Sequence, residues 1–179
     1  MTYPIITSKH FTIGRNNIKP RLIVIHTMET PETRGKAYQV ATWFAGPSSP
    51  QASAHYMVDD AEVYSTVAEA NTAWAVGDWK LNEYSISIEH AGSAEQTPTQ
   101  WDDAYSNAEL KISAKLAAEI AKRYGIPLIH LTPGEVNDGR SGFIGHVDVT
   151  TAQKIKGGHT DPGPNFPWSK YLALVKENL

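Results

Sequence analysis

The stretch Arg21-Leu-Ile-Val-Ile-His-Thr27 constrains the architecture of this chain more than any other. It is a continuous run rich in β-branched residues with apolar side chains on both faces, which is typical of a central strand covered on both sides. A second stretch, Tyr84-Ser-Ile-Ser-Ile-Glu89, alternates instead, and it places Ser85, Ser87 and Glu89 on one face. Because that face is polar and carries little bulk, we expect a ligand to lie across it.

The remaining pattern supplies helices, a hairpin and two long loops around these strands. A helix is expected from about Thr33 to Ala45, because Gly46-Pro47 follows it. A second helix is expected behind the capping box Ser106-Asn-Ala-Glu109 as far as Tyr124, with an earlier start near Trp101 as the alternative. The sequence therefore predicts an α/β protein with a mixed central β-sheet flanked by helices. The other predicted elements are a hairpin (54–58 and 62–67), loops at 131–145 and 157–167, and a closing helix at 168–179.

Length and composition limit the possible classes of protein. The chain has 179 residues, a formal net charge of −3 and no cysteine. Its length is typical of one domain with its own core. The missing cysteine excludes a disulfide framework and a thiol nucleophile, and it leaves imidazole and carboxylate as the ligands for a metal such as zinc. The negative net charge argues against a nucleic-acid partner, because nucleic-acid-binding domains typically carry a basic face.

Targeting signals are not legible in the sequence. The N-terminal residues lack a basic start followed by an apolar run, and the longest apolar stretch is far shorter than the ~20 residues that cross a bilayer. We therefore expect a protein made in the cytoplasm without a signal peptide and with no membrane partner.

Several familiar catalytic motifs are missing, and histidines are the remaining candidates for chemistry. The sequence has no nucleophile elbow, no phosphate-binding loop, no dinucleotide fingerprint and no His-Glu-x-x-His helix. His26 ends the first predicted strand, whereas His146, His159 and Asp161 lie in or beside glycine-rich segments. Ligands from separate strand ends and loops can converge on a catalytic zinc. Spacing alone leaves metal binding and ordinary hydrogen bonding about equally open.

Five motifs in order resemble a known family. They are Val24-Ile-His26, Ser53-Ala-His-Tyr56, Ser85-Ile-Ser-Ile-Glu89, Gly145-His-Val-Asp148 and His159-Thr-Asp-Pro-Gly-Pro164. Together they look like the zinc-dependent N-acetylmuramoyl-L-alanine amidases of type 2, whose fold is shared with peptidoglycan-recognition proteins. The last two motifs are especially similar to the catalytic domains of phage endolysins. The resemblance spans about 21–168, which implies that residues 1–179 form a single amidase catalytic domain with no separate wall-binding domain.

The resemblance also implies roles for particular residues. The zinc ligands of the family fall on His26, His146 and Asp161, and its catalytic carboxylate falls on Glu89. His159 stands where other members carry a lysine, so the resemblance implies that it stabilises the oxyanion. Some members have a tyrosine where this chain has alanine, at position 54, which leaves Glu89 as the acid and base.

Contacts to the substrate are predicted less sharply. Trp74 lies in a glycine-containing stretch before Glu89, and His55 lies in a hairpin strand. We predict substrate contacts for His55, Trp74, Ser85 and Ser87, although a strand histidine is more often hydrogen-bonded within its sheet.

Several functions remain open from sequence. The leading one is zinc-dependent hydrolysis of the amide between N-acetylmuramic acid and L-alanine in bacterial peptidoglycan, by a monomeric phage endolysin that acts at the cell wall after release. The alternatives are a cytosolic amidase that recycles soluble muropeptides, a non-catalytic peptidoglycan-binding protein on the same fold, and a metalloprotease that cuts the stem peptide.

Overall fold

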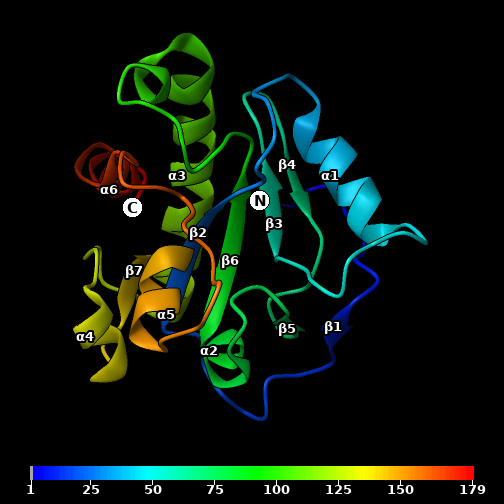
Figure 1. Cartoon of the computed structure of the whole chain (residues 1–179), viewed down its shortest axis with the longest axis vertical. Coiled ribbons are helices and arrows are strands. Elements are labelled where there is room, and N and C mark those ends of the chain that lie inside the picture. The colour runs from blue at the N-terminus through cyan, green and yellow to red at the C-terminus, as the bar shows by residue number, and fades with distance from the viewer. Residues whose placement is uncertain (1) are drawn as a thin grey trace.

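A mixed five-stranded sheet forms the centre of the computed structural model, which describes residues 2–179. The strand order is β4-β3-β6-β2-β7, and only the β3–β4 pair is antiparallel. In Figure 1, β6 runs through the middle of the molecule. The strands are β2 (Leu22–Thr27), β3 (Tyr56–Val58), β4 (Val63–Ser65), β6 (Ser85–His90) and β7 (Gly142–Gly145).

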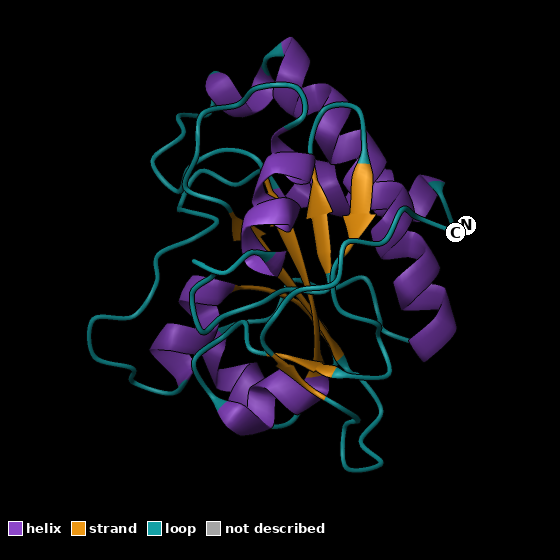
Figure 2. Ribbon diagram, turned by 90° about the vertical axis from the view of Figure 1, so that its right-hand side faces the viewer, coloured by secondary structure: helices purple, strands orange, loops and turns teal. Residues whose placement is uncertain are grey.

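Helices flank this sheet on both sides (Figure 2), so the predicted fold class is confirmed. Two further short strands, β1 (Phe11–Thr12) and β5 (Thr72–Ala73), form a separate antiparallel pair. None of the described helices is both long and apolar enough to cross a membrane. The helices are α1 (Lys36–Ala45), α2 (Trp79–Tyr84), α3 (Ala104–Tyr124), α4 (Pro133–Asn137), α5 (His146–Ala152) and α6 (Trp168–Glu177), with a 3-10 turn η1 (Gln100–Asp102).

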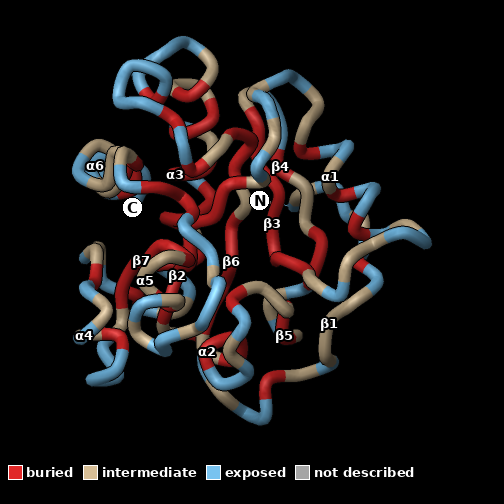
Figure 3. Tube along the Cα trace, in the orientation of Figure 1, coloured by how far each residue is buried: buried red, intermediate tan, exposed pale blue. Residues whose placement is uncertain are grey.

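The two faces of the sheet are covered by different helices. On one face, Ile23 and Ile86 join a core with α3 and α6. On the other face, Leu22 and Val24 pack with residues of α2, α4 and α5. Figure 3 shows the resulting buried centre along β2, β6 and β7. Burying each such side chain stabilises the fold by about 1.5–3 kcal/mol, and the alternation of β2 sends His26 to the face that carries α5.

The N-cap of helix α3 lies three residues before the cap expected from the capping box. Asp103 is the N-cap, because its carboxylate accepts the backbone N–H of Ser106 at 2.9 Å. Ser106 and Glu109 lie inside the helix and are buried. The prediction of a capping box at 106–109 was therefore wrong, because an aspartate just upstream supplies a cap of equal quality.

The segment 131–145 was predicted as a loop and contains two elements. Helix α4 starts at a true capping box formed by Thr132 and Glu135. Strand β7 then pairs with β2 in parallel and buries Phe143 and Ile144. Glycine opens this strand because a Cβ at Gly142 would lie 2.6 Å from the carbonyl oxygen of Ile129. The glycines that suggested a loop therefore serve close backbone packing.

Glu109 gives the fold a testable pH dependence. Its side chain is fully buried and accepts the N–H of Ala91 at 2.7 Å, and burial raises its pKa well above the usual value. At a pH above the pKa of the unfolded state, Glu109 therefore keeps a proton in the folded state that it releases on unfolding. The free energy of unfolding then falls as pH rises. We expect the melting temperature of Glu109→Gln to exceed that of the wild type by a margin that widens from about pH 5 to about pH 8. A constant difference across this range, measured by calorimetry, would contradict the assignment.

Candidate active site

The site is built where two parallel strands end side by side. His26 of β2 pairs in register with Glu89 of β6, so both side chains lie on the same face near the carboxyl ends of their strands. His26 is buried and Glu89 is partly buried. Open α/β sheets bind their ligands at this end of their strands.

The start of a helix and a loop bring further ligand-type side chains to this edge. His146 is the first residue of α5 and follows β7 directly. The N–H of Val147 donates to the carbonyl oxygen of Asp161 at 2.9 Å, which ties the loop carrying Asp161 to the same helix. Nδ1 of His26 lies 3.0 Å from Oδ2 of Asp161, and Nδ1 of His146 lies 3.2 Å from Oδ1. We call His26, His146 and Asp161 the triad.

The charges in the site depend on burial and on these contacts. Burial by itself raises the pKa of Asp161, but the hydrogen bonds from His146 and His26 outweigh it and hold that pKa well below the usual value. Burial lowers the pKa of His26. Burial, followed by the charges of Asp161 and Glu29, raises the pKa of Glu89 well above its usual value. The site thus pairs an ionised Asp161 with a carboxyl group at Glu89 that holds its proton more tightly.

The triad fits a zinc ion. One potential ligand atom from each of the three residues lies within 4.8 Å of the other two. Ligands at about 2.0–2.1 Å around a tetrahedral ion are separated by about 3.3 Å, close to the spacing of the two imidazole nitrogens from the Asp161 oxygens. Two imidazoles and one carboxylate are also a common ligand set of hydrolytic zinc, with a fourth position left open.

His159 lies beside the triad on its solvent side. Its ring stacks on that of His146, with the ring centroids 4.2 Å apart, and its side chain is 67% exposed. Its backbone N–H donates to Oγ1 of Thr150 at 3.1 Å, which fixes the loop against α5. The structure therefore brings together all five residues that the resemblance singled out for zinc binding and catalysis.

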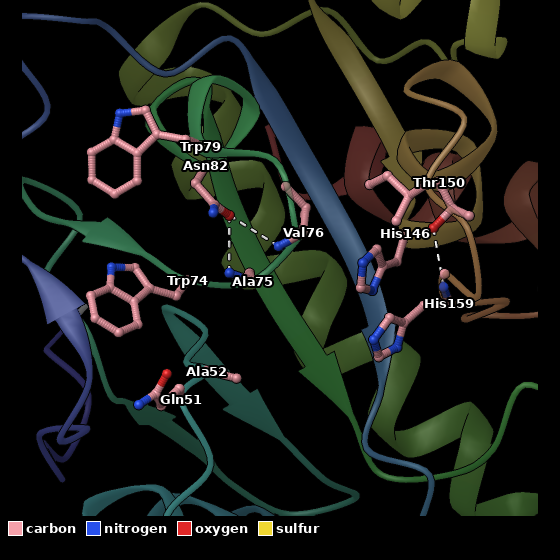
Figure 4. A pocket seen from close by; sticks show the side chains of 13 residues that line it. Gln51, Ala52, Trp74, Ala75, Val76, Trp79, Asn82, His146, Thr150 and His159 are labelled. Carbon is pink, nitrogen blue, oxygen red and sulfur yellow. Dashed lines mark hydrogen bonds between the residues drawn. The ribbon is translucent and has the colours of Figure 1, made fainter.

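Two adjoining cavities open beside the triad. The first, about 250 Å³, is lined by the whole triad together with Glu89, Glu29 and Trp43, and we call it the triad pocket. The second, about 500 Å³, is the tryptophan pocket, which Trp79 and Trp74 line on one wall and His146 and His159 on the other (Figure 4). The cavities share Ala52, Trp74, Ala75, His146 and His159.

The predicted substrate contacts divide into two groups. Trp74 lines both pockets. By contrast, His55, Ser85 and Ser87 are at most 1% exposed, and none of them lines either pocket. Nδ1 of His55 accepts the N–H of Ser87 at 3.0 Å, so it joins neighbouring segments of the sheet. We correct the expectation accordingly: this part of the polar face is internal, and only its end at Glu89 reaches the cleft.

Sequence reasoning missed Glu29 as a cleft residue. It follows β2 closely, in left-handed backbone geometry with a φ of 52°. Its carboxylate accepts the hydroxyl of Thr27 at 2.6 Å and the N–H of Ala94 at 3.0 Å. Its position just past the end of a central strand was the available signal, because ligand sites concentrate there.

Beside the carboxyl ends of β2 and β7, the mixed α/β sheet carries two histidines and an aspartate that could hold a metal ion, which is a kind of site found in hydrolases. Comparison with known proteins makes this class more specific. The family model described as N-acetylmuramoyl-L-alanine amidase (Amidase_2) matches residues 14–164. The chain belongs to this family and is an amidase.

Individual relatives agree with the family assignment. Over 157 residues the chain is 32% identical to N-acetylmuramoyl-L-alanine amidase A of Achromobacter lyticus, covering 86% of this chain and 81% of the relative. It is 26% identical to the 1,6-anhydro-N-acetylmuramyl-L-alanine amidase AmpD of Citrobacter freundii, covering 95% and 88%. The fold is similar to that of the Staphylococcus aureus hydrolase AmiA, with a TM-score of 0.73 and 19% identity over 99% of this chain and 83% of that one. A mutant Bacillus subtilis endolysin matches with a TM-score of 0.62 and 20% identity, over 97% and 99%.

Proposed function

We propose that this amidase uses zinc to hydrolyse the amide between the lactyl group of N-acetylmuramic acid and the L-alanine of the peptidoglycan stem peptide. The observation that carries the proposal is the triad, whose donor atoms lie within 4.8 Å of one another at the edge of an open cavity shared with Glu89. The complete triad also favours an enzyme over a non-catalytic binding protein.

In this proposal each residue has a defined role. His26, His146 and Asp161 would hold the zinc ion, which supplies Lewis-acid activation of water and of the scissile carbonyl when bound. Glu89 accepts the proton of the attacking water and delivers it to the leaving amine. Its raised pKa favours the first transfer, because burial makes the carboxylate a stronger acceptor for the proton of the attacking water. His159 donates a hydrogen bond to the carbonyl oxygen as negative charge develops there.

The experiment is digestion of purified peptidoglycan by the protein, with identification of the new termini. We expect new N-terminal L-alanine and peptide-free glycan, and we expect a chelator to stop their release. New termini within the stem peptide would instead indicate a metalloprotease, and no release by zinc-loaded protein would contradict the proposal.

We further propose an endolysin-like role on the intact cell wall, with the recycling of soluble muropeptides as the second candidate. The recycling role is favoured by the similarity to AmpD over 95% of this chain, and the endolysin role by the resemblance of Gly145-His-Val-Asp148 and His159-Thr-Asp-Pro-Gly-Pro164 to the catalytic domains of phage endolysins. Rates on intact sacculi and on soluble anhydro-muropeptides, measured side by side, separate the two. A clear preference for the soluble substrate would support recycling.

Gly163 gives a prediction about how the loop positions Asp161. Its φ is +90°, and an added Cβ would overlap the carbonyl oxygen of Ala94. Gly163→Ala must therefore displace the loop, and we expect zinc affinity to fall about 10- to 100-fold, the usual effect of disturbing the support of a ligand. A competition titration with a chromogenic chelator measures this affinity.

Gly157→Ala is the matched control. Gly157 also has a positive φ, +63°, but nothing lies within 4 Å of an added Cβ. It carries the same kind of backbone strain without the overlap, so its zinc affinity should stay near that of the wild type. Equal losses in both variants would show that general loop strain, and not the contact with Ala94, is responsible.

A further inference from the structure

We propose that Asp148 positions the metal centre, because its carboxylate fixes the junction between β7 and α5 that places His146 and the loop carrying Asp161. Asp148 is a positioning residue and not a ligand, since it acts through the backbone of Gly145. This inference rests on the zinc ion of the proposed function, but it concerns metal affinity and geometry, which are measured without hydrolysis.

The junction between β7 and α5 has no room for a side chain of its own. Gly145 ends β7, and the next residue, His146, begins α5 (Figure 1). A Cβ at Gly145 would lie 2.7 Å from Cδ of Pro162, the residue after Asp161, which is closer than real Cβ contacts. Glycine is therefore needed where the loop packs against the end of the strand. Because glycine has no side chain, this N-cap residue cannot cap α5 itself.

Asp148 supplies the cap instead. Its Oδ2 accepts the backbone N–H of Gly145 at 2.7 Å, which is the acidic half of a capping box. The carboxylate lies in the first turn of α5, where the helix dipole stabilises negative charge. In the same turn, the N–H of Val147 donates to the carbonyl oxygen of Asp161 at 2.9 Å. One carboxylate therefore orders the turn that carries one triad residue and holds the backbone of another.

Two further side chains orient the carboxylate of Asp148. Nε2 of His130 lies 3.3 Å from Oδ2 of Asp148, and this nitrogen carries the proton because an ionised carboxylate only accepts. The ring of His130 stacks on that of Trp168, the first residue of α6, with centroids 3.8 Å apart. None of these three residues lines the triad pocket or the tryptophan pocket. They support the triad from behind, away from the substrate.

The test is a competition titration of zinc with a chromogenic chelator, carried out on the full chain. Asp148→Ala leaves the N–H of Gly145 without its acceptor, and we expect zinc affinity to fall about 10- to 100-fold. Asp148→Asn keeps an oxygen that can accept this N–H, so it should restore most of the affinity. His130→Phe keeps an aromatic ring to stack on Trp168 but removes the donor to Asp148, and we expect a smaller loss in the same direction.

Glu135→Ala is the matched control for the loss of a helix cap. Oε2 of Glu135 accepts the N–H of Thr132 at 2.8 Å, so this side chain caps α4 in the way that Asp148 caps α5. Helix α4 packs against α5 but carries no triad residue. Both alanine variants should lower the melting temperature of the metal-free protein, whereas only Asp148→Ala should lower the affinity for zinc.

Cobalt(II) in place of zinc gives a readout that a purely structural cap would not change. The visible absorption of bound cobalt(II) depends on its ligands and on their geometry. We expect the spectrum of cobalt-loaded Asp148→Ala to differ from that of the wild type in band position or intensity. The spectra of Asp148→Asn and Glu135→Ala should match the wild type.

Three results would overturn the role of Asp148: wild-type zinc affinity in Asp148→Ala, equal losses in Asp148→Ala and Glu135→Ala, or an Asp148→Asn variant no better than Asp148→Ala. If Asp148→Ala does not fold, unchanged affinity in His130→Phe would overturn it instead. Zinc binding by a wild type that does not hydrolyse peptidoglycan would contradict the proposed function and leave the role of Asp148 standing. A wild type that binds no zinc would overturn both.

Discussion

Glu89→Gln is expected to lower kcat on peptidoglycan by about 10³-fold, within the range that general acid–base catalysis contributes. Glutamine keeps the size and the hydrogen-bonding oxygen of the side chain but cannot accept and return a proton. Oε2 of Glu89 is buried without a partner among the described residues, as expected for a group that is to meet water or substrate. Steady-state rates of amine release measure the effect.

Two controls separate catalysis from structure in that experiment. Zinc content should be unchanged in Glu89→Gln, because Glu89 is not part of the triad, and KM should change little. Glu95→Gln, which alters an exposed carboxylate outside both pockets, should retain full activity. A Glu89→Gln enzyme with zinc bound and more than about one tenth of the wild-type rate would show that another group transfers the proton.

Asp161→Ala is expected to abolish zinc binding and, with it, activity. Asp161 is the residue that both imidazoles of the triad contact, so its loss removes one ligand and the anchor of the other two. Zinc that binds only the folded state stabilises it, by about 4 kcal/mol at a free concentration 1,000 times the dissociation constant. Added zinc should therefore raise the melting temperature of the metal-free wild type by several degrees and leave that of Asp161→Ala unchanged.

Activity and thermal stability must respond together in the zinc experiment. Metal-free wild type should regain activity on addition of one equivalent of zinc, whereas Asp161→Ala should not. If zinc raised the melting temperature of both proteins equally, the stabilising site would lie elsewhere. If the chelated wild type kept its full rate, the metal would have no part in the reaction.

The central strands were predictable because the order of apolar and polar side chains along each strand indicates which of its faces is buried. The unbroken apolar run of β2 and the alternation of β6 each identified a strand and its faces. The elements at 131–145 were missed because β7 has only four residues, of which the first and last are glycines, and α4 has only five. Such short elements gain their stability from packing against β2 and α5, which local sequence does not display.

The site was predictable through its motifs and only partly through its chemistry. The residues themselves indicated that His26 ends a strand and that Glu89 lies at the end of a polar face. Their position side by side follows from the parallel register of β2 and β6, which no local pattern encodes. The burial of Ser87 was unpredictable for the same reason, since His55, whose Nδ1 accepts the backbone N–H of Ser87, comes from a different part of the chain. Contacts between distant segments decide which polar residues meet solvent.

Digestion of peptidoglycan in water enriched in oxygen-18 tests the central claim most directly. Hydrolysis at the proposed bond places one labelled oxygen on the lactyl carboxylate of N-acetylmuramic acid and releases unlabelled stem peptide with a free L-alanine amine. Mass spectrometry of the glycan and peptide fractions distinguishes these positions. We predict label on the lactyl carboxylate alone, dependent on zinc and on Glu89. Label in a carboxylate of the stem peptide, or no incorporation by zinc-loaded protein, would contradict the account.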